Sequence, residues 1–142
     1  QSVDVENDGT PLTKEMLDYI YRNKTSALIE AAMMIGAQLA GTSEEQIAAA
    51  EKAAGDIGMA FQIQDDVLDV IGNEALLGKP IHSDEKNEKT TWVTVYGLEQ
   101  ARKDVSEYSQ EAMDILSGMQ EVTEPKASFL YHFVEYLIHR NK

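Results

Sequence analysis

The residues of this sequence that are best suited to chemistry lie in one short segment, residues 61–69. Residues three and four positions apart share a face of an α-helix, so four polar side chains of the segment fall within an arc of about 100°. We call these four residues the acidic sector: Gln62, Asp65, Asp66 and Asp69. Most other positions between Ile57 and Ile71 are apolar. An acidic sector on an otherwise apolar helix predicts a site for a cation.

The expected cation is a hard divalent metal. A helix that is apolar around most of its circumference should be buried, and buried carboxylates are unfavourable unless a protein cation or a metal pairs with them. No Lys or Arg lies between Ala53 and Leu77 to form a local ion pair. Carboxylates without nearby His or Cys suit Mg²⁺, which takes one or two carboxylates together with water and phosphate oxygens. The alternative, a solvated acidic face, fits the apolar remainder of the helix less well.

The composition narrows the classes of partner. The 142 residues suffice for one domain with a core, and the absence of Cys excludes disulfides and thiolate chemistry, which is compatible with a cytoplasmic location. Twenty-five acidic against twelve basic residues give a net charge of −13, which disfavours nonspecific binding to nucleic acid or anionic membranes. No apolar run approaches the ~20 residues of a transmembrane helix. An anionic ligand would therefore need metal ions and locally placed lysines.

Two helices are expected in the N-terminal third. Thr13 is suited to cap a helix that runs to about Arg22, and a second helix should end near Gly41. The apolar positions of the second helix repeat at helical spacing: Leu28, Ile29, Ala32, Met33, Ile35 and Leu39. Met33 and Met34 are interpreted as core residues.

A long central helix should carry the acidic sector. Ser43–Gln46 has the spacing of a capping box, so the helix is predicted to begin there and to run to about Ile71. Its first half is rich in small residues, including Gly55 and Gly58. These glycines suit either close helix packing, the favoured interpretation, or room for a ligand. The pattern breaks from Gly72 to Glu88, where we expect an ordered loop or short turns.

The C-terminal third is also predicted to be helical. Leu98–Gly118 has the spacing of an amphipathic helix, and Pro125 opens a last helix. The apolar stripe of that helix is formed by Phe129, Leu130, Phe133, Val134, Leu137 and Ile138. Neither strand alternation nor an internal repeat stands out, so the predicted fold class is all-α, a helical bundle.

Lysines near the acidic sector are candidates for binding an anion. Lys24 and Thr25 are expected at the start of the second helix, where backbone N–H groups and a lysine together suit an anion. Lys79, Asp84 and Lys89 follow the acidic helix, and their spacing has no helical meaning, so a loop must bring them together. Each is by default a solvated charge, but their position just beyond a metal site favours phosphate neutralisation.

Other catalytic motifs are not found. The sequence has no glycine-rich phosphate loop, no nucleophile elbow and no Cys-His pairing. His82, His132 and His139 have no motif partners and are interpreted as surface or structural residues. Metal-assisted diphosphate chemistry remains as the expected activity.

The motifs described above resemble, in type and order, those of the trans-isoprenyl diphosphate synthases. The resemblance spans most of the chain and rests on Gln1-x-x-Asp4, Lys24-Thr25, Phe61-Gln62-x-x-Asp65-Asp66-x-x-Asp69, Gly78-Lys79 and Asp84…Lys89. Gly97–Ala101 and the ending Arg140-Asn141-Lys142 are most similar to bacterial farnesyl diphosphate synthases, also called geranyltranstransferases. Glu88, which directly precedes Lys89, stands where many relatives have Gly.

The resemblance implies a role for each candidate residue. Asp65, Asp66 and Asp69 would be the second aspartate-rich motif and would bind Mg²⁺, with Asp65 as the principal direct ligand and Asp84 in the second shell. The diphosphate of an allylic substrate would be bound by Lys24, Lys79 and Lys89. Thr25 and Gln62 would place oxygen dipoles near the carbocation that forms when the diphosphate departs.

The implied reaction is the condensation of dimethylallyl or geranyl diphosphate with isopentenyl diphosphate. The family's first aspartate-rich motif is missing, because Asp65-Asp66-x-x-Asp69 is the only such motif in the sequence, and the chain does not begin with Met. We therefore expect residues 1–142 to be the C-terminal part of a single all-helical synthase domain, inactive alone and homodimeric in the complete enzyme. The alternatives are a noncatalytic partner subunit of a hetero-oligomeric synthase, a geranylgeranyl diphosphate synthase and, less favoured, a terpene cyclase of the same helical fold.

Overall fold

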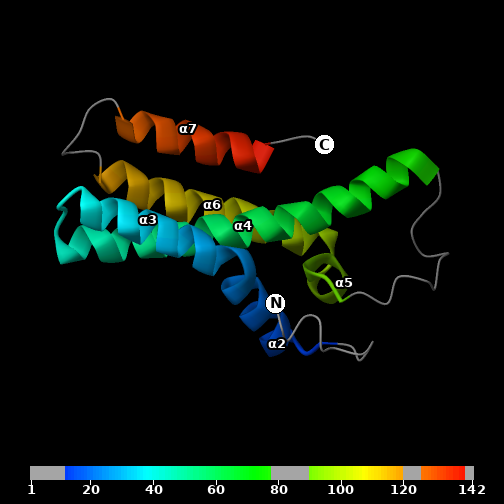
Figure 1. Ribbon diagram of the computed structural model, residues 1–142. Helices are drawn as coiled ribbons and strands as arrows, with labels where there is room; N and C mark the ends of the chain where they lie inside the picture. Colours follow the sequence, from blue (N-terminus) through cyan, green and yellow to red (C-terminus); the bar gives the residue numbers. More distant parts are fainter. Residues whose placement is uncertain (1–11, 78–89, 120–125, 140–142) are drawn as a thin grey trace.

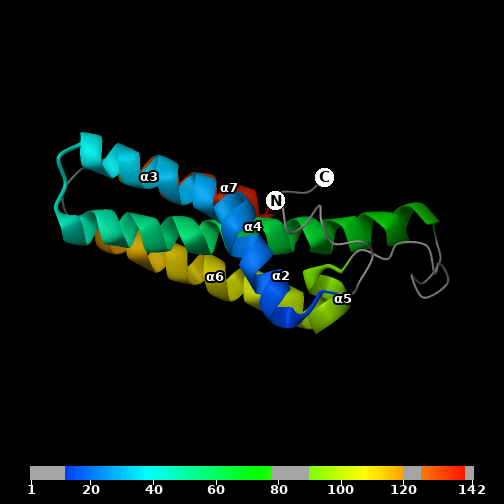
Figure 2. The same ribbon diagram turned by 60° about the horizontal axis from the view of Figure 1, so that its bottom comes forward.

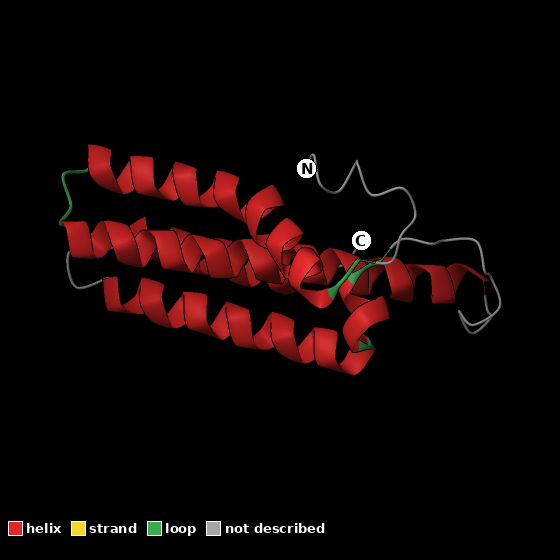
Figure 3. Cartoon of the chain, turned by 90° about the horizontal axis from the view of Figure 1, so that it is seen from below, coloured by secondary structure: helices red, strands yellow, loops and turns green. Residues whose placement is uncertain are grey.

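The computed structural model describes residues 12–77, 90–119 and 126–139. These residues form helices joined by short turns and contain no strand, which confirms the predicted all-α class (Figures 1 and 3). The helical segments are α2 (Lys14–Tyr21), the π-helical turn η1 (Arg22–Ser26), α3 (Ala27–Leu39), α4 (Glu44–Leu77), α5 (Trp92–Tyr96), α6 (Leu98–Gly118) and α7 (Lys126–His139). None of the helices in these ranges is long and apolar enough to cross a membrane.

The long helix α4 is the centre of the bundle. It packs against α3 on one side and α6 on the other, and α7 lies along α6 (Figures 1 and 2). Helix α2 starts near α5, crosses α4 and continues through η1 into the beginning of α3 (Figure 2). The acidic sector lies on α4 near this crossing, so the bundle places it beside η1, α2 and α5.

The predicted helix caps are confirmed. Thr13 Oγ1 accepts a hydrogen bond from the Met16 N–H at 3.2 Å. At the start of α4, the Gln46 N–H donates to Ser43 Oγ, and the Ser43 N–H donates to Gln46 Oε1, each at 3.3 Å. These reciprocal bonds form the capping box and satisfy two donors that the first turn of a helix leaves unpaired. They explain why the boundary at residue 43 could be predicted.

Two apolar clusters hold the bundle together. The first joins α2, α4, α5 and α6 and consists of Leu17, Ile20, Tyr21, Met59, Ile63, Val67, Trp92, Ala101 and Val105. The second joins α4, α6 and α7 and consists of Ala53, Ile57, Ala112, Leu116 and Val134. Partly buried Ile29 and Met33 of α3 pack against the second cluster. The first cluster lies directly under the acidic sector, because Ile63 and Val67 alternate with its polar residues along α4.

Two predicted boundaries are wrong. Helix α4 continues through Gly72 to Leu77, so the loop predicted from Gly72 is wrong for residues 72–77, and residues 78–88 lie outside the described residues. Helices α2 and α3 are not separate, because η1 joins them and the residues at both junctions keep right-handed helical φ and ψ angles. Lys24 and Thr25 therefore lie inside a continuous helical stretch and not at a helix N-terminus. Backbone N–H groups of a helix start are not available there to bind an anion.

The apolar stripe predicted for the second helix is mostly exposed. No residue of α3 is buried, including Met33 and Met34, and within the stripe only Ile29 and Met33 are of intermediate exposure. Leu28, Ile35 and Leu39 remain 74%, 58% and 84% exposed, whereas Ile29 and Met33 face the core. On α7, Val134 is buried, while Leu130 and Phe133 are exposed. Helical spacing thus identified the helices correctly but did not show which apolar residues the described part of the chain buries.

Gly58 is the closest point between α4 and η1. A Cβ at Gly58 would lie 2.5 Å from the Cα of Ser26, which is itself fully buried. A clash with backbone is relieved only by moving one helix away from the other. The favoured interpretation of Gly58, close helix packing, is supported by this geometry.

We expect Gly58→Ala to lower the free energy of unfolding by about 1–3 kcal/mol, the usual range for overpacking a core. Gly36→Ala is the matched control, because Gly36 lies within α3 and a Cβ there meets nothing within 4 Å. That control should raise stability by about 0.5–1 kcal/mol through helix propensity. Urea unfolding followed by circular dichroism measures both, and equal effects of the two substitutions would contradict the close approach at Gly58.

Candidate functional site: the acidic sector of α4

The acidic sector is only partly buried, whereas the sequence predicted that its helix is buried. Gln62, Asp65 and Asp66 are of intermediate exposure, and Asp69 is exposed. Asp69 is four residues from Asp65 and three from Asp66, so it lies between these two around α4, and they are about 100° apart. The three aspartates of the motif thus do not all face the same surroundings.

Asp66 is held by protein donors from two other helices. Its Oδ2 accepts a hydrogen bond from the Tyr21 hydroxyl, which is contributed by α2. The same oxygen accepts a bond from the backbone N–H of Trp92, the first residue of α5, at 2.9 Å. Hydrogen bonds to a carboxylate are stronger than neutral ones, and they stabilise its charged form. Asp66 therefore joins α2, α4 and α5, a role that its sequence spacing did not indicate.

Gln62 is bound to the same tyrosine through the backbone. Its Nε2 donates to the carbonyl oxygen of Tyr21 at 2.5 Å, and Ser26 Oγ donates to that carbonyl at 3.3 Å. The carbonyl lies at the start of the π-helical turn. Turns of this kind occur frequently at functional sites, because one extra residue alters the regular hydrogen bonding of a helix. The side-chain amide of Gln62 is thereby fixed against η1.

Lys24 and Thr25 are brought to the same part of α4. Both belong to η1, which packs on α4 through the contact of Ser26 with Gly58 and the bond of Gln62 with Tyr21. Lys24 is exposed and Thr25 is of intermediate exposure. The turn η1 and the acidic sector, which are almost forty residues apart in sequence, thus lie next to each other, as a shared site requires.

The other predicted site residues lie outside the described residues. These are Lys79, Asp84 and Lys89, together with His82. His132, on α7, is exposed, and its Nδ1 lies 3.5 Å from Glu135 Oε2, which agrees with the predicted surface role. The side chain of His139 is not described.

The carboxylates of the acidic sector suit a magnesium ion better than a metal that needs protein ligands on every side. Within residues 12–77, 90–119 and 126–139, no group of three or more His, Cys, Asp or Glu side chains is arranged to hold a metal ion. Mg²⁺ commonly takes only one or two carboxylates and completes its shell with water and phosphate oxygens. Asp65 and Asp69, which share one side of α4, match that requirement.

A cavity of about 390 Å³ between α2, α5 and α6 was not predicted. It is lined by the acids Asp18, Asp104, Glu107 and Glu111 and by Trp92, Tyr96, Tyr108 and Gln100. Burial raises the pKa of Asp18, and burial together with the charge of Asp18 raises the pKa of Tyr96. The cavity is not suited to a diphosphate, because its four carboxylates would repel the phosphate charges. The lining residues come from three separate helices and form no motif in the sequence, so nothing in the sequence indicated this cavity.

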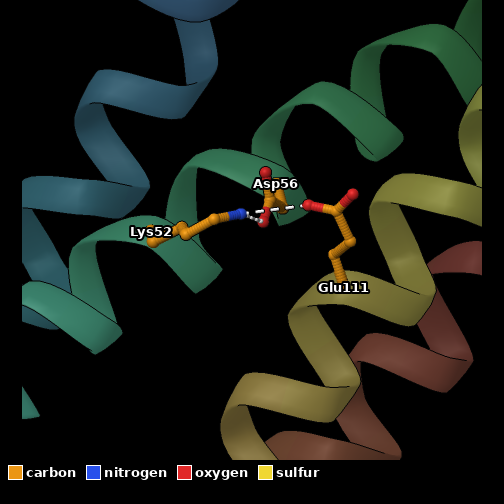
Figure 4. Close-up of polar contacts among 3 residues, drawn as sticks. All are labelled: Lys52, Asp56 and Glu111. Atoms are coloured by element: carbon orange, nitrogen blue, oxygen red, sulfur yellow. Dashed lines mark hydrogen bonds and ion pairs between the residues drawn. The ribbon is translucent and has the colours of Figure 1, made fainter.

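One ion-pair cluster connects α4 to α6. Lys52 Nζ lies 2.9 Å from Asp56 Oδ2 and 3.0 Å from Glu111 Oε2 (Figure 4). These hydrogen bonds raise the pKa of Lys52. Asp56 is buried, so Lys52 provides the opposite charge that a buried carboxylate needs. This lysine is therefore part of the bundle and not a ligand-binding residue of the acidic sector.

Comparisons with known proteins identify the family of this chain. The family described as Polyprenyl synthetase matches residues 1–129. The farnesyl diphosphate synthase of Escherichia coli is 38% identical, over all of this chain and 48% of its own length. The geranylgeranyl diphosphate synthase of Cyanophora paradoxa is 37% identical, over 99% of this chain and 46% of its own. The chain thus spans about half the length of the curated relatives it matches.

Two solved structures have the same fold. A putative farnesyl-diphosphate synthase from Marinomonas sp. MED121 is similar with a TM-score of 0.77 and 26% identity, over 96% of this chain and 44% of that one. A geranyltransferase from Helicobacter pylori, complexed with magnesium and isoprenyl diphosphate, is similar with a TM-score of 0.70 and 25% identity, over 97% of this chain and 44% of that one.

We expect Asp18→Asn to stabilise the chain at pH 7. The folded-state pKa of Asp18 is raised above 3.8, so its contribution to stability is fully present below that pH and is lost as pH rises through the folded-state pKa. Asparagine removes the buried charge, so the urea midpoint should rise at pH 7 and the gain should vanish below about pH 3.8. Asp114→Asn, an exposed acid of α6, is the control. A gain that is independent of pH would contradict the burial of a charge at Asp18.

Proposed function

Because the chain belongs to the polyprenyl synthetase family, we propose that it supplies the metal and diphosphate site of a farnesyl-type diphosphate synthase. The observation that carries the proposal is the contact between η1 and the acidic sector of α4. Lys24 and Thr25 both belong to η1. A cation-binding face and a lysine side by side suit a diphosphate, which needs its charge neutralised from more than one direction.

The proposed reaction joins an allylic diphosphate to isopentenyl diphosphate. The C–O bond of the allylic substrate breaks, and the electron pair leaves with the diphosphate. The double bond of isopentenyl diphosphate attacks the resulting carbocation, and a proton is then lost to the departed diphosphate. Atoms and charge balance without a further reagent.

The chain's own residues would assist each stage. Lys24, with Lys79 and Lys89, would bind the diphosphate and stabilise its charge as it leaves. Mg²⁺, held by Asp65 and Asp69 with Asp66 beside them and Asp84 in the second shell, would supply further charge neutralisation. Oxygen atoms of Thr25 and Gln62 would lie near the carbocation. The Nε2 of Gln62 donates to the Tyr21 carbonyl, which restrains the amide and supports this proposed role.

The proposal concerns the type of reaction and not the length of the product. Relatives of nearly equal identity, 38% and 37%, are named for farnesyl and for geranylgeranyl diphosphate. The similar structure with bound magnesium and isoprenyl diphosphate supports a site for these ligands in the fold. A noncatalytic partner subunit is the remaining alternative, and it is separated from the enzyme by the experiments below.

We expect purified residues 1–142 to be inactive alone. The chain spans about half the length of its relatives and contains one Asp-Asp-x-x-Asp motif. Incubation with geranyl diphosphate, labelled isopentenyl diphosphate and Mg²⁺ should give no extractable labelled product. Product formation above the level of a reaction without Mg²⁺ would show that the site of this chain is sufficient.

A chimera tests whether the site is catalytic. Residues 1–142 would replace the matching segment of the Escherichia coli farnesyl diphosphate synthase, which aligns with the whole chain. We expect the chimera to be active and Asp65→Ala within it to lower kcat/KM by at least about a hundredfold, as loss of direct charge stabilisation does. Glu51→Ala, an exposed acid on the same helix, should leave activity unchanged.

Retained turnover in the Asp65→Ala chimera would remove Asp65 from the metal site. A folded chimera without activity would favour the noncatalytic partner. Far-ultraviolet circular dichroism distinguishes a folded chimera from an unfolded one.

A further inference from the structure

Tyr21 contacts two of the four residues of the acidic sector with two different groups. Its hydroxyl donates to Asp66 Oδ2, and its backbone carbonyl accepts from Gln62 Nε2. Tyr21 is itself buried, and its ring packs at 5.4 Å between centroids from that of Trp92. A single residue of α2 is thus bound to both ends of the segment 62–66.

The backbone of Tyr21 is held in place from α4. Gln62 binds its carbonyl, and Ser26, five residues further on, also donates to that carbonyl. Ser26 sits directly against Gly58, where a Cβ would leave no room. The position of the tyrosine hydroxyl is therefore supported by contacts with the two turns of α4 that precede Asp66, at Gly58 and Gln62.

Asp66 Oδ2 is bound by two donors at once. The Trp92 N–H lies 2.9 Å from this oxygen and 3.3 Å from the Tyr21 hydroxyl oxygen, so the three groups form a compact cluster. A carboxylate bound on one oxygen by two donors from different helices cannot rotate freely. Asp65, on the preceding position of the same helix turn, shares the backbone that this cluster immobilises.

We propose that Tyr21 is a positioning residue for the acidic sector: it anchors Asp66 and the adjoining turn of α4, so that Asp65 and Asp69 are held in the geometry that binds Mg²⁺ and diphosphate. This inference rests on the proposed function, which assigns ligand binding to Asp65 and Asp69. Tyr21 itself does not contact the ligand. It acts through Asp66, as outer residues that orient metal ligands do.

Tyr21→Phe tests the inference with a minimal change. The ring and the backbone carbonyl are kept, and only the hydroxyl that binds Asp66 is lost. Tyr19→Phe is the matched control, because Tyr19 lies on the same helix, undergoes the same chemical change and is 57% exposed. The probe is Mg²⁺ with inorganic diphosphate, titrated calorimetrically into residues 1–142.

Two readouts separate positioning from a purely structural role. The first is the dissociation constant of Mg²⁺ with diphosphate, which Tyr21→Phe should raise by about tenfold or more, the usual effect of removing an outer partner of a metal ligand. The second is the nuclear magnetic resonance signal of the Asp66 carboxyl carbon and the Trp92 amide, which should shift in Tyr21→Phe only. Helicity and the urea midpoint show that the variant is folded.

Each result bears on the inference. Shifted signals with weakened binding, and neither effect in Tyr19→Phe, are expected. Shifted signals with unchanged binding would show that the hydroxyl only supports the fold, and unchanged signals would show that it does not hold Asp66; either result overturns the inference alone. Absence of Mg²⁺ and diphosphate binding by the unaltered chain would overturn the proposed function and the inference with it.

Discussion

The close approach of η1 to α4 is the constraint on which the rest of the site depends. Two helical backbones meet at Gly58 and Ser26, where a single methyl group would separate them. With this contact in place, the carbonyl of Tyr21 comes within reach of Gln62, and its hydroxyl comes within reach of Asp66. Gly58, in the first half of α4, therefore allows the acidic sector to meet η1, although it carries no functional group.

The acidic sector also shows how one helix can satisfy a structural and a chemical demand together. Sequence reasoning assigned the three aspartates to a metal because no basic residue lies nearby in sequence. The charge of Asp66 is stabilised in part by two neutral hydrogen-bond donors. These are the hydroxyl of Tyr21, 45 residues away in sequence, and the backbone N–H of Trp92, 26 residues away. Asp65 and Asp69, which lie within the same arc of α4, are the residues proposed to bind the ligand. Asp66 thus has a structural role in addition to the one that the sequence predicts for the motif.

Local signals made most of the fold predictable. The capping residues Thr13 and Ser43 and the spacing of the apolar residues in α6 depend only on neighbours within one or two turns. The errors concern features that tertiary contacts decide. Helix α5 has five residues, too few for a periodic pattern, and the π-helical turn arises where α2 must fit against α4. The exposed apolar positions of α3 look the same in sequence as the partly buried Ile29 and Met33, because periodicity does not tell which side of a helix finds a partner.

Trp92, the only tryptophan of the chain, lies in the apolar cluster where α2, α4, α5 and α6 meet. Its indole lies 4.7 Å between centroids from the ring of Tyr96, and its Nε1–H donates to Asp104 Oδ2 at 2.7 Å. Intrinsic fluorescence of this protein therefore reports on the contact of α5 with α2, α4 and α6, and hardly at all on the distant end of the bundle. Circular dichroism is dominated by the long helices. Agreement between the two signals during unfolding would mean that the junction and the bundle melt as one cooperative unit, and a difference would reveal local opening of α5.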